Sequence, residues 1–253
     1  MKSVNEEYVC KSFPAIEGNI TIFGSRATLS SLKTGFYYMP IDSGTNFMFE
    51  FLNYKFGEIF EKQNQYKKQY RLLNEKEKQY IYERISDGQF LYALLDEKDD
   101  LSNNLKVLAN IQKEIIDILN RQIGFFDFVS SCKCYGSSDG ETVCGSESYD
   151  DDKIKNVIKN SNYIILNGGF NKKKPTSPLN YFYGFLKRHP EIKHIIGNKE
   201  RKETCFAEGK LLFDDGHIVN YYALPSTSGG NKTYQKEECF EYWKKLLDKI
   251  LEN

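Results

Sequence analysis

The stretch YYALPSTSGGNK, residues 221–232, sets an apolar run directly against a polar turn. Residues 221–224 have the aromatic and aliphatic composition of a buried strand, and Pro225 marks its end. After the small polar residues of the turn, the amphipathic pattern KTYQKEECFEYWKKLLDKILEN, residues 232–253, predicts a helix. A strand, a polar loop and a helix in this order form the repeating unit of an α/β fold.

Similar units occur earlier in the chain. NITIFG (19–24), GFFDFVSS (124–131) and NYIILNGG (162–169) are short apolar runs typical of buried strands, and polar loops follow them. GKLLFDDGHIVNYYALP (209–225) indicates two strands joined by Asp215-Gly216, a dipeptide that favours a type I′ hairpin turn. We therefore expect a three-layer α/β/α sandwich with a largely parallel central sheet.

Helical patterns fill much of the remaining chain. FMFEFLNYKFGEIFEK (47–62) carries Phe47, Phe51 and Tyr54 at helical spacing, which predicts that they face the core. From about residue 61 to 122 the chain is charged, with apolar residues recurring every three or four positions. The pattern predicts one domain, residues 1–253, in which residues 61–122 form extra packing helices.

Composition narrows the classes of function. The 253 residues carry a formal net charge of zero, so no broad basic field attracts nucleic acid. No window has 18 or more apolar residues, and we expect no membrane partner. Of the six cysteines, Cys132, Cys134 and Cys144 cluster but lack a fourth ligand at a usual spacing; free thiols are therefore favoured over a zinc site. We expect an intracellular monomer with no metal and no cofactor.

Four polar loops follow the predicted strands: residues 24–32, 130–139, 167–174 and 224–232. In α/β sheets, ligands bind just beyond the carboxyl ends of the strands. The four loops are therefore expected to converge on one edge of the sheet.

The motifs in these loops, in order, are IFGSRATLSSL (22–32), GFYYMPIDSGTNFMF (35–49), FFDFVSSCKCYGSSD (125–139), IILNGG (164–169) and LPSTSGGNK followed by Trp243. Together they resemble the uracil-DNA glycosylase superfamily, and most of all its hypoxanthine (deoxyinosine) DNA glycosylase branch. The chain departs from that pattern at Ala27-Thr28, where the family has Pro-Gly, and at PIDSGT, which replaces a His-Pro turn. Compared with the family, the helical region at about 61–122 looks like a helical insertion. The resemblance implies hydrolysis of the N-glycosidic bond of a deaminated or modified base in DNA, with hypoxanthine and uracil as first candidates.

The resemblance also implies roles for individual residues. Asn46 is the leading catalytic candidate, with a helix N-cap as the equally weighted alternative. Asp42 is a candidate general base or a solvated turn residue. Five residues are assigned to the base pocket: Gly24, Ser25, Tyr38, Phe47 and Asn167. Tyr38 and Phe47 are candidates to stack on a flipped base, and Asn167 to hydrogen-bond its edge, with core packing and an ordinary turn as the alternatives.

DNA contacts are assigned to loop hydroxyls and one lysine: Ser137, Ser138, Ser226, Thr227, Ser228 and Lys232. Small hydroxyls and unhindered N–H groups between a strand and a helix suit a phosphate, although an ordinary capping loop has the same composition. The basic run at residues 172–174 lies close to Asn167 in the sequence and is a candidate local patch for DNA, with a solvated surface as the alternative. Two other functions stay open: a glycosylase-like module that binds DNA, a nucleotide or a protein without catalysis, and a hydrolase of free modified nucleotides.

Overall fold

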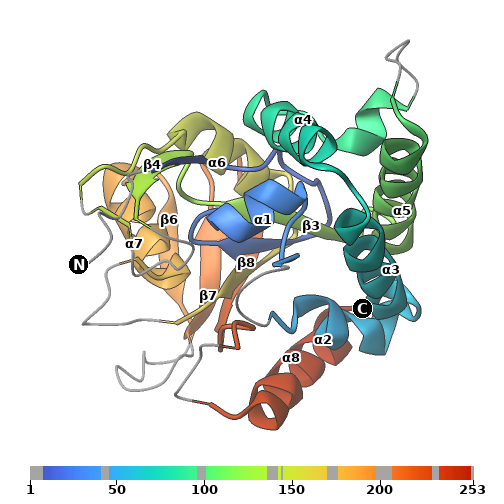
Figure 1. The fold of residues 1–253 in the computed structure, drawn as a ribbon. Helices are drawn as coiled ribbons and strands as arrows, with labels where there is room; N and C mark the ends of the chain where they lie inside the picture. The colour runs from blue at the N-terminus through green and yellow to red at the C-terminus, as the bar shows by residue number, and fades with distance from the viewer. Residues whose placement is uncertain are drawn as a thin grey trace.

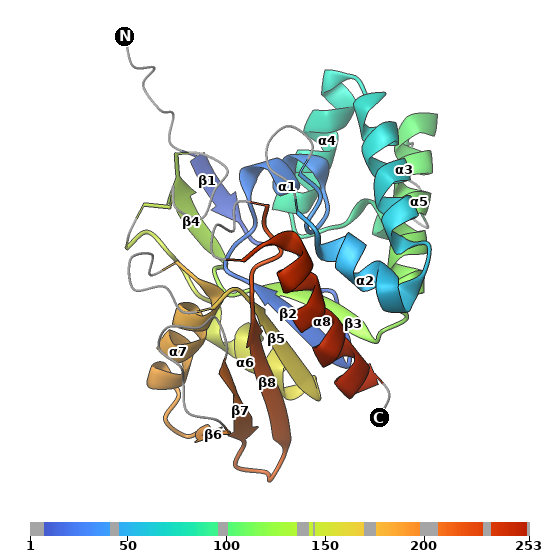
Figure 2. The same cartoon turned by 90° about the horizontal axis from the view of Figure 1, so that it is seen from below.

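A computed structural model describes residues 8–40, 46–95, 101–135, 142–143, 145–169, 176–197, 207–229 and 234–251. Its centre is a six-stranded sheet (Figures 1 and 2). In spatial order the strands are β3 (Ile123–Asp127), β2 (Ile20–Gly24), β5 (Tyr163–Asn167), β8 (Ile218–Leu224), β7 (Ala207–Leu212) and β6 (Lys193–Ile196).

The first four strands of this order are mutually parallel. β7 is antiparallel to β8, and β6 is antiparallel to β7. All five residues of β2 and of β3 are buried, which is why their sequences are continuous apolar runs rather than alternating ones. The predicted, largely parallel sheet is confirmed.

Helices cover both faces of the sheet. α8 (Lys236–Leu251) lies across one face, and α6 (Asp151–Lys159) lies behind the other (Figure 2). α8 buries Trp243, Leu246, Leu247 and Ile250, as the amphipathic pattern predicted. α1 (Leu29–Thr34) and α7 (Pro178–Arg188) follow β2 and β5. The α/β class with helices on both faces is therefore confirmed.

The hairpin between β7 and β8 is confirmed, but the predicted turn type is wrong. Gly216 has a φ of 84°, whereas Asp215 is not among the residues with positive φ, and a type I′ turn needs both. The Gly216 N–H donates to the Phe213 carbonyl at 2.9 Å, and the Phe213 N–H donates to the His217 carbonyl at 3.0 Å. This is a three-residue turn in which Gly216 takes the left-handed position.

Further helices form in the two regions with helical patterns, residues 47–62 and 61–122. They are α2 (Met48–Phe56), α3 (Ile59–Arg71), α4 (Glu75–Ser86), the 3₁₀ turn η1 (Leu91–Leu94) and α5 (Asn103–Leu119). Figure 1 shows α3, α4 and α5 grouped beside α1 and β3. We call α3, α4, η1 and α5 the helical block. In α2, Phe51 is buried but Tyr54 is 43% exposed, so the prediction that Tyr54 faces the core is wrong.

A second, two-stranded sheet pairs β1 (Tyr8–Lys11) with β4 (Ser131–Cys134), and the β4 residues lie within the loop predicted at 130–139. Its inward face buries Cys10, Cys132 and Cys134. Cys10 and Cys134 are free thiols, as predicted, and burial raises the pKa of Cys10 to about 12. Within the described ranges, no three His, Cys, Asp or Glu side chains are grouped to hold a metal ion. None of the described helices has the length and apolar character needed to cross a membrane.

Candidate functional site

Four polar segments meet at one edge of the sheet because four parallel strands end there. β3 ends at Asp127, β2 at Gly24 and β5 at Asn167, and β8 leads into residues 225–229. These strands are adjacent in the order β3-β2-β5-β8. The ends of these four strands lie side by side as predicted, although the described part of the loop predicted at 130–139 mostly forms β4; this edge is the candidate site (Figure 2).

Thr227 is the centre of a buried hydrogen-bond network at this edge. Its side chain is completely buried, and its Oγ1 accepts from Asn167 Nδ2 and donates to Asn46 Oδ1, both at 3.1 Å. Its backbone N–H donates to Asn167 Oδ1 at 2.9 Å. Three segments far apart in sequence are thereby joined by neutral groups. We call Asn46, Asn167 and Thr227 the strand-end network.

The network fixes the orientation of the Asn46 amide. Asn46 Oδ1 accepts from the Met48 N–H at 2.9 Å as well as from the Thr227 hydroxyl. A backbone N–H can only donate, so the oxygen must be the atom that faces it, and the amide cannot be flipped. Among the described residues no acceptor bonds its Nδ2. The side chain therefore presents N–H donors rather than a carbonyl.

Asn167 is held at both ends of its amide by the same residue. Its Oδ1 and Nδ2 both bond Thr227, and it is only 7% exposed. Next to it, Gly168 has a φ of 139°, and a Cβ there would lie 3.0 Å from Pro178 Cδ at the start of α7. Both the oxygen and the nitrogen of the Asn167 amide therefore serve to hold Thr227 in place.

The loop that carries Thr227 is anchored from two sides. The Trp243 Nε1–H of α8 donates to the Pro225 carbonyl at 3.0 Å, and the Phe47 N–H donates to the Thr227 carbonyl at 2.9 Å. Asn46 and Ser228 form an antiparallel bridge. The loop before α8 is consequently positioned by both the core helix and the start of α2.

A carboxylate lies at the ends of the neighbouring strands. Asp127, at the end of β3, is 4% exposed. A Cβ added to Gly24 would lie 2.3 Å from Asp127 Oδ1 and 3.4 Å from the Tyr38 hydroxyl. The carboxylate and the phenol therefore meet over Gly24, in space that a side chain on β2 would fill. Tyr38 is a non-glycine residue with a φ of 54°, a backbone conformation that costs energy.

Tyr37 lies behind this group and faces the core. Its ring packs 5.5 Å from that of Phe125, and its hydroxyl donates to the Pro14 carbonyl at 3.2 Å. Burial, together with the charge of Asp127, holds the pKa of Tyr37 well above its usual range. Tyr37 is a neutral packing residue, and Tyr38 is the member of the pair at the site.

The structure separates the remaining predicted residues. Phe47 packs on Phe51 at 6.1 Å and lies 4.8 Å below Lys236 Nζ, and none of its ring contacts in the described part of the chain is with Tyr38. Ser25 is buried, and its carbonyl accepts from Val129 at 3.0 Å. Ser226 Oγ accepts from the Ser228 N–H at 3.2 Å. Asp42, Ser137, Ser138 and Lys232 lie outside the described residues.

Sequence reasoning gave no role to Asp127. The signal was present, because FFDFV (125–129) places one carboxylate inside an apolar run. Buried carboxylates are rare unless they are paired or functional. What the sequence could not supply is the neighbouring strand, whose Gly24 leaves room for the carboxylate.

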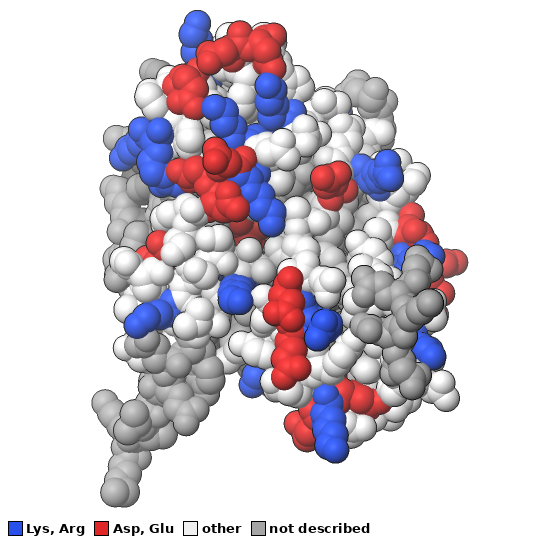
Figure 3. Space-filling model, turned by 90° about the horizontal axis from the view of Figure 1, so that it is seen from above, with Lys and Arg blue, Asp and Glu red and all other residues white. Residues whose placement is uncertain are grey.

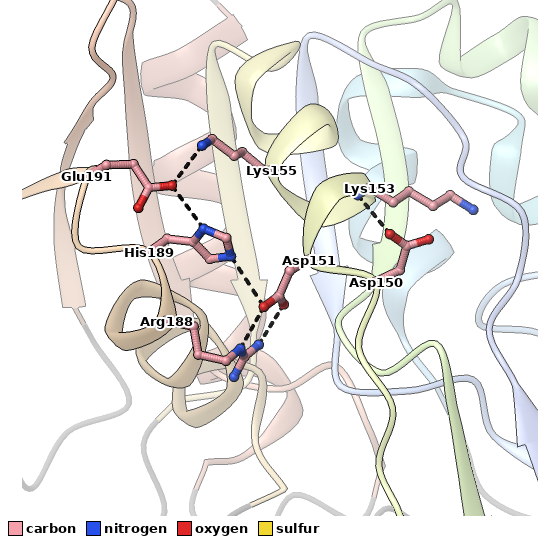
Figure 4. A network of polar contacts seen from close by, with 7 residues as sticks. All are labelled: Asp150, Asp151, Lys153, Lys155, Arg188, His189 and Glu191. Atoms are coloured by element: carbon pink, nitrogen blue, oxygen red, sulfur yellow. Dashed lines mark hydrogen bonds and ion pairs between the residues drawn. The ribbon is translucent and has the colours of Figure 1, made fainter.

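A cluster of charged side chains joins α6 to the end of α7. Asp151 Oδ1 and Oδ2 accept from Arg188, each at 2.7 Å, and His189 lies between Asp151 at 3.3 Å and Glu191 at 3.0 Å (Figure 4). Glu191 also pairs with Lys155 at 2.8 Å. We call these five residues the α6–α7 ion network. On the face drawn in Figure 3, positive and negative residues are interspersed, and neither sign dominates.

Comparison with known proteins gives one similar structure. No protein-family model matches the chain, and no curated protein matches its sequence. A solution NMR structure of a candidate uracil DNA glycosylase from Methanosarcina acetivorans is similar, with 15% identity and a TM-score of 0.48. The match covers 97% of this chain and 100% of that one.

Proposed function

We propose that the chain is an N-glycosyl hydrolase that removes a deaminated or modified base from DNA. The observation that carries this proposal is the fixed amide of Asn46, whose Oδ1 is held by two donors so that Nδ2 is directed elsewhere. Asn46 is joined to the ends of β5 and β8 through Thr227. A donor locked at the carboxyl edge of a parallel sheet suits a ligand that gains negative charge during the reaction.

Breaking an N-glycosidic bond leaves electron density on the departing base while the sugar becomes an oxocarbenium-like cation. A donor aimed at a carbonyl oxygen of the base stabilises that charge, and loss of one such preorganised donor typically slows the reaction by about 10²- to 10³-fold. We assign this role to Asn46. Asn167 and Thr227 are positioning residues that hold its orientation.

Asp127 supplies the complementary acceptor. The Asp127 carboxylate is 4% exposed and occupies the space directly above Gly24 at the carboxyl edge of the sheet, and a carboxylate there can accept from a hydrogen-bond donor of a ligand. Hypoxanthine and uracil, like guanine and thymine, carry a ring N–H beside a carbonyl, whereas adenine and cytosine, from which they arise by deamination, lack it. We infer that Asp127 reads the ring N–H of the base, while Asn46 bonds its carbonyl. The hypoxanthine resemblance of the sequence agrees with this pairing.

Access to such a site requires the base to leave the helix. Flipping costs a few kcal/mol of stacking, which an aromatic face at the site offsets in part. Tyr38 is the ring next to Asp127, and Ser226 and Ser228 flank Thr227 on the loop before α8. We assign stacking to Tyr38 and contacts with the phosphate backbone to the two serines.

One observation favours a second candidate, a hydrolase of free modified nucleosides or nucleotides. Proteins that bind the DNA backbone usually carry a basic surface, whereas this chain has a formal net charge of zero. A small substrate would need only the strand-end site. The two candidates share the same chemistry and differ in the length of the substrate.

The test is base release from single- and double-stranded oligonucleotides that carry hypoxanthine or uracil, and from the corresponding mononucleotides. Asn46→Ala is compared with Asn53→Ala, because Asn53 on α2 also accepts a backbone N–H, from Phe60 at 3.2 Å. We expect release to fall about 100-fold in Asn46→Ala only. Release from mononucleotides alone would select the second candidate. Equal rates in Asn46→Ala and wild type would remove Asn46 from the chemistry, and no release with retained binding would identify a non-catalytic module.

A further inference from the structure

The helical block makes direct contact with the backbone that leads into Tyr38. Tyr66 of α3 donates its hydroxyl to the Thr34 carbonyl at 2.6 Å, and Gln112 of α5 donates to the Gly35 carbonyl at 2.9 Å. Gln63 of α3 donates to the carbonyl of Tyr38 itself at 3.2 Å. Nearer the start of this segment, Tyr70 donates to the Lys33 carbonyl at 3.0 Å. Four carbonyls within residues 33–38 are thus bonded by side chains of α3 and α5.

These donors are buried far more deeply than their residue types normally are. Gln63 is 1% exposed and Gln112 is completely buried, as is Tyr66. Burying an amide or a phenol is costly unless it forms a hydrogen bond, and here each one bonds the same short backbone segment. Gln112 is satisfied at its other end too, since its Oε1 accepts from the Tyr92 N–H at 2.9 Å. Burial raises the pKa of Tyr66, so its hydroxyl stays protonated and remains a donor.

The bonded segment cannot hold its own shape. α1 has only six residues, too few for a helix that is stable by itself. It ends at Gly35 in the left-handed conformation, and a Cβ there would lie 2.4 Å from Ile81 Cγ2 of α4. Three residues later, Tyr38 has a φ of 54°, which costs on the order of 1–3 kcal/mol and persists only when surrounding contacts impose it.

We propose that the helical block serves to position Tyr38, with Gln63 as the principal positioning residue. By fixing the Tyr38 carbonyl, Gln63 keeps the backbone left-handed and so places the phenol beside Asp127 above Gly24. Gln112 and Tyr66 fix the turn that precedes it. This inference rests on the proposed function for its consequence in catalysis, but its structural part stands on the four hydrogen bonds.

Core packing alone is the competing explanation, and it makes a different prediction. If the block only adds apolar burial, loss of the Gln63 amide should lower stability without changing the conformation of Tyr38. If the block positions Tyr38, the same change should release Tyr38 from its left-handed backbone. A matched loss at Tyr70, which bonds Lys33 and not Tyr38, should leave Tyr38 in place in both cases.

The experiment uses the full chain labelled with ¹³C and ¹⁵N, as wild type, Gln63→Met and Tyr70→Phe. Gln63→Leu is the second variant, because leucine fills much of the same space and has no N–H or O–H to donate. Backbone ¹³Cα and ¹³Cβ shifts of Tyr38 report whether φ is positive. We expect them to move toward extended values in both Gln63 variants and to stay unchanged in Tyr70→Phe. Unchanged Tyr38 shifts in a folded Gln63 variant would overturn the proposal.

Base release by the same four proteins tests the consequence for catalysis. We expect kcat/KM to fall about tenfold or more in the Gln63 variants and less than twofold in Tyr70→Phe, when the variants are compared at equal fraction folded. If wild type releases no base, the proposed function fails while the shifts of Tyr38 still decide the positioning role. If the shifts move and release is unaffected, Tyr38 is positioned by the block but is not needed for the chemistry, which overturns the functional half.

Discussion

The strand-end network and the α6–α7 ion network both join segments that are distant in sequence, but one is neutral and buried whereas the other is charged and partly solvated. Thr227 and Asn167 are almost fully buried, and each of their bonds has a single possible direction. In the ion network the Arg188 side chain is 39% exposed and that of Asp151 is 28% exposed. Neutral amides and hydroxyls cost less to bury than ions, so they can fix a site inside the protein.

The difference separates two tasks. The neutral network sets the geometry of the candidate site, and that geometry should be indifferent to salt and to moderate changes of pH. The charged network ties the start of α6 to the end of α7, and its contribution should be small and sensitive to both. Substitutions in each network can break or sharpen this comparison.

Thr227→Val should have the largest effect. Valine has nearly the same shape but no hydroxyl, so Asn167 Nδ2 loses its acceptor and Asn46 Oδ1 loses one donor in a buried setting. We expect the free energy of unfolding to fall by about 2–3 kcal/mol, measured by urea denaturation. Thr227→Ser is the control, since it keeps the hydroxyl and should lose clearly less. Equal losses in the two variants would show that the methyl group, and not the network, carries the stability.

Gly24→Ala tests the space at the other end of the site. The added methyl would lie 2.3 Å from Asp127 Oδ1, so either the carboxylate or β2 must shift. We expect a loss of about 1–2 kcal/mol from overpacking, together with loss of base release. Gly184→Ala on α7 is the matched control, because its nearest contact would be an ordinary 3.6 Å from Arg188 Nη1 and alanine favours a helix. A Gly24→Ala protein as stable and active as wild type would mean that Asp127 moves freely.

The sequence predicts the parts of this site that depend on local pattern. Apolar runs identify β2, β3, β5 and the end of β8, and the polar residues at or just after the ends of β5 and β8 include Asn167 and Thr227. β6 was missed because its four residues, Lys193–Ile196, are an exposed edge strand without the burial that makes a strand recognisable. The contacts of Asn46 with Thr227 span 181 positions, so no local rule yields them.

The helical block shows a second reason why the sequence alone does not predict the contacts around the site. Gln63, Tyr66 and Tyr70 recur at spacings of three and four, which places them on one face of α3, but polar side chains in a charged helix are normally solvated. Their burial follows from the backbone carbonyls of residues 33–38 that they meet, and those carbonyls leave no trace in the sequence pattern. A periodic stripe of glutamine and tyrosine is the one signal that would have indicated a buried polar face.

Arg188→Gln should have a smaller effect than either site variant. It removes the paired bonds to Asp151, but the guanidinium is partly exposed and screened by water. We expect a loss of about 0.5–1 kcal/mol at low salt, which shrinks at 1 M salt, where the screening length is roughly 3 Å. Lys187→Gln, at the neighbouring exposed position, should be close to neutral. A penalty that does not change with salt would show that Arg188 acts by packing on Tyr149, 4.5 Å away, instead of by charge.

Lowering the pH should also distinguish the two networks, and we expect its effect on stability to be the smallest of the four. Lys155 and then the Glu191 backbone N–H and His189 hold the pKa of Glu191 at about 2, and Arg188 lowers the pKa of Asp151. A carboxyl whose pKa is depressed by folding contributes stability above its unfolded pKa, about 4, and loses it as pH falls through the folded value.

The stability difference between wild type and Glu191→Gln should therefore shrink from about pH 4 toward pH 2, as measured by urea unfolding at each pH. The Thr227→Val penalty should stay constant over the same range, because none of the three residues in that network titrates. A constant Glu191 difference would mean that the ion pair with Lys155 contributes nothing in solution. A Thr227 penalty that falls with it would mean that the two networks are coupled through β5, which links α6 to the strand-end site.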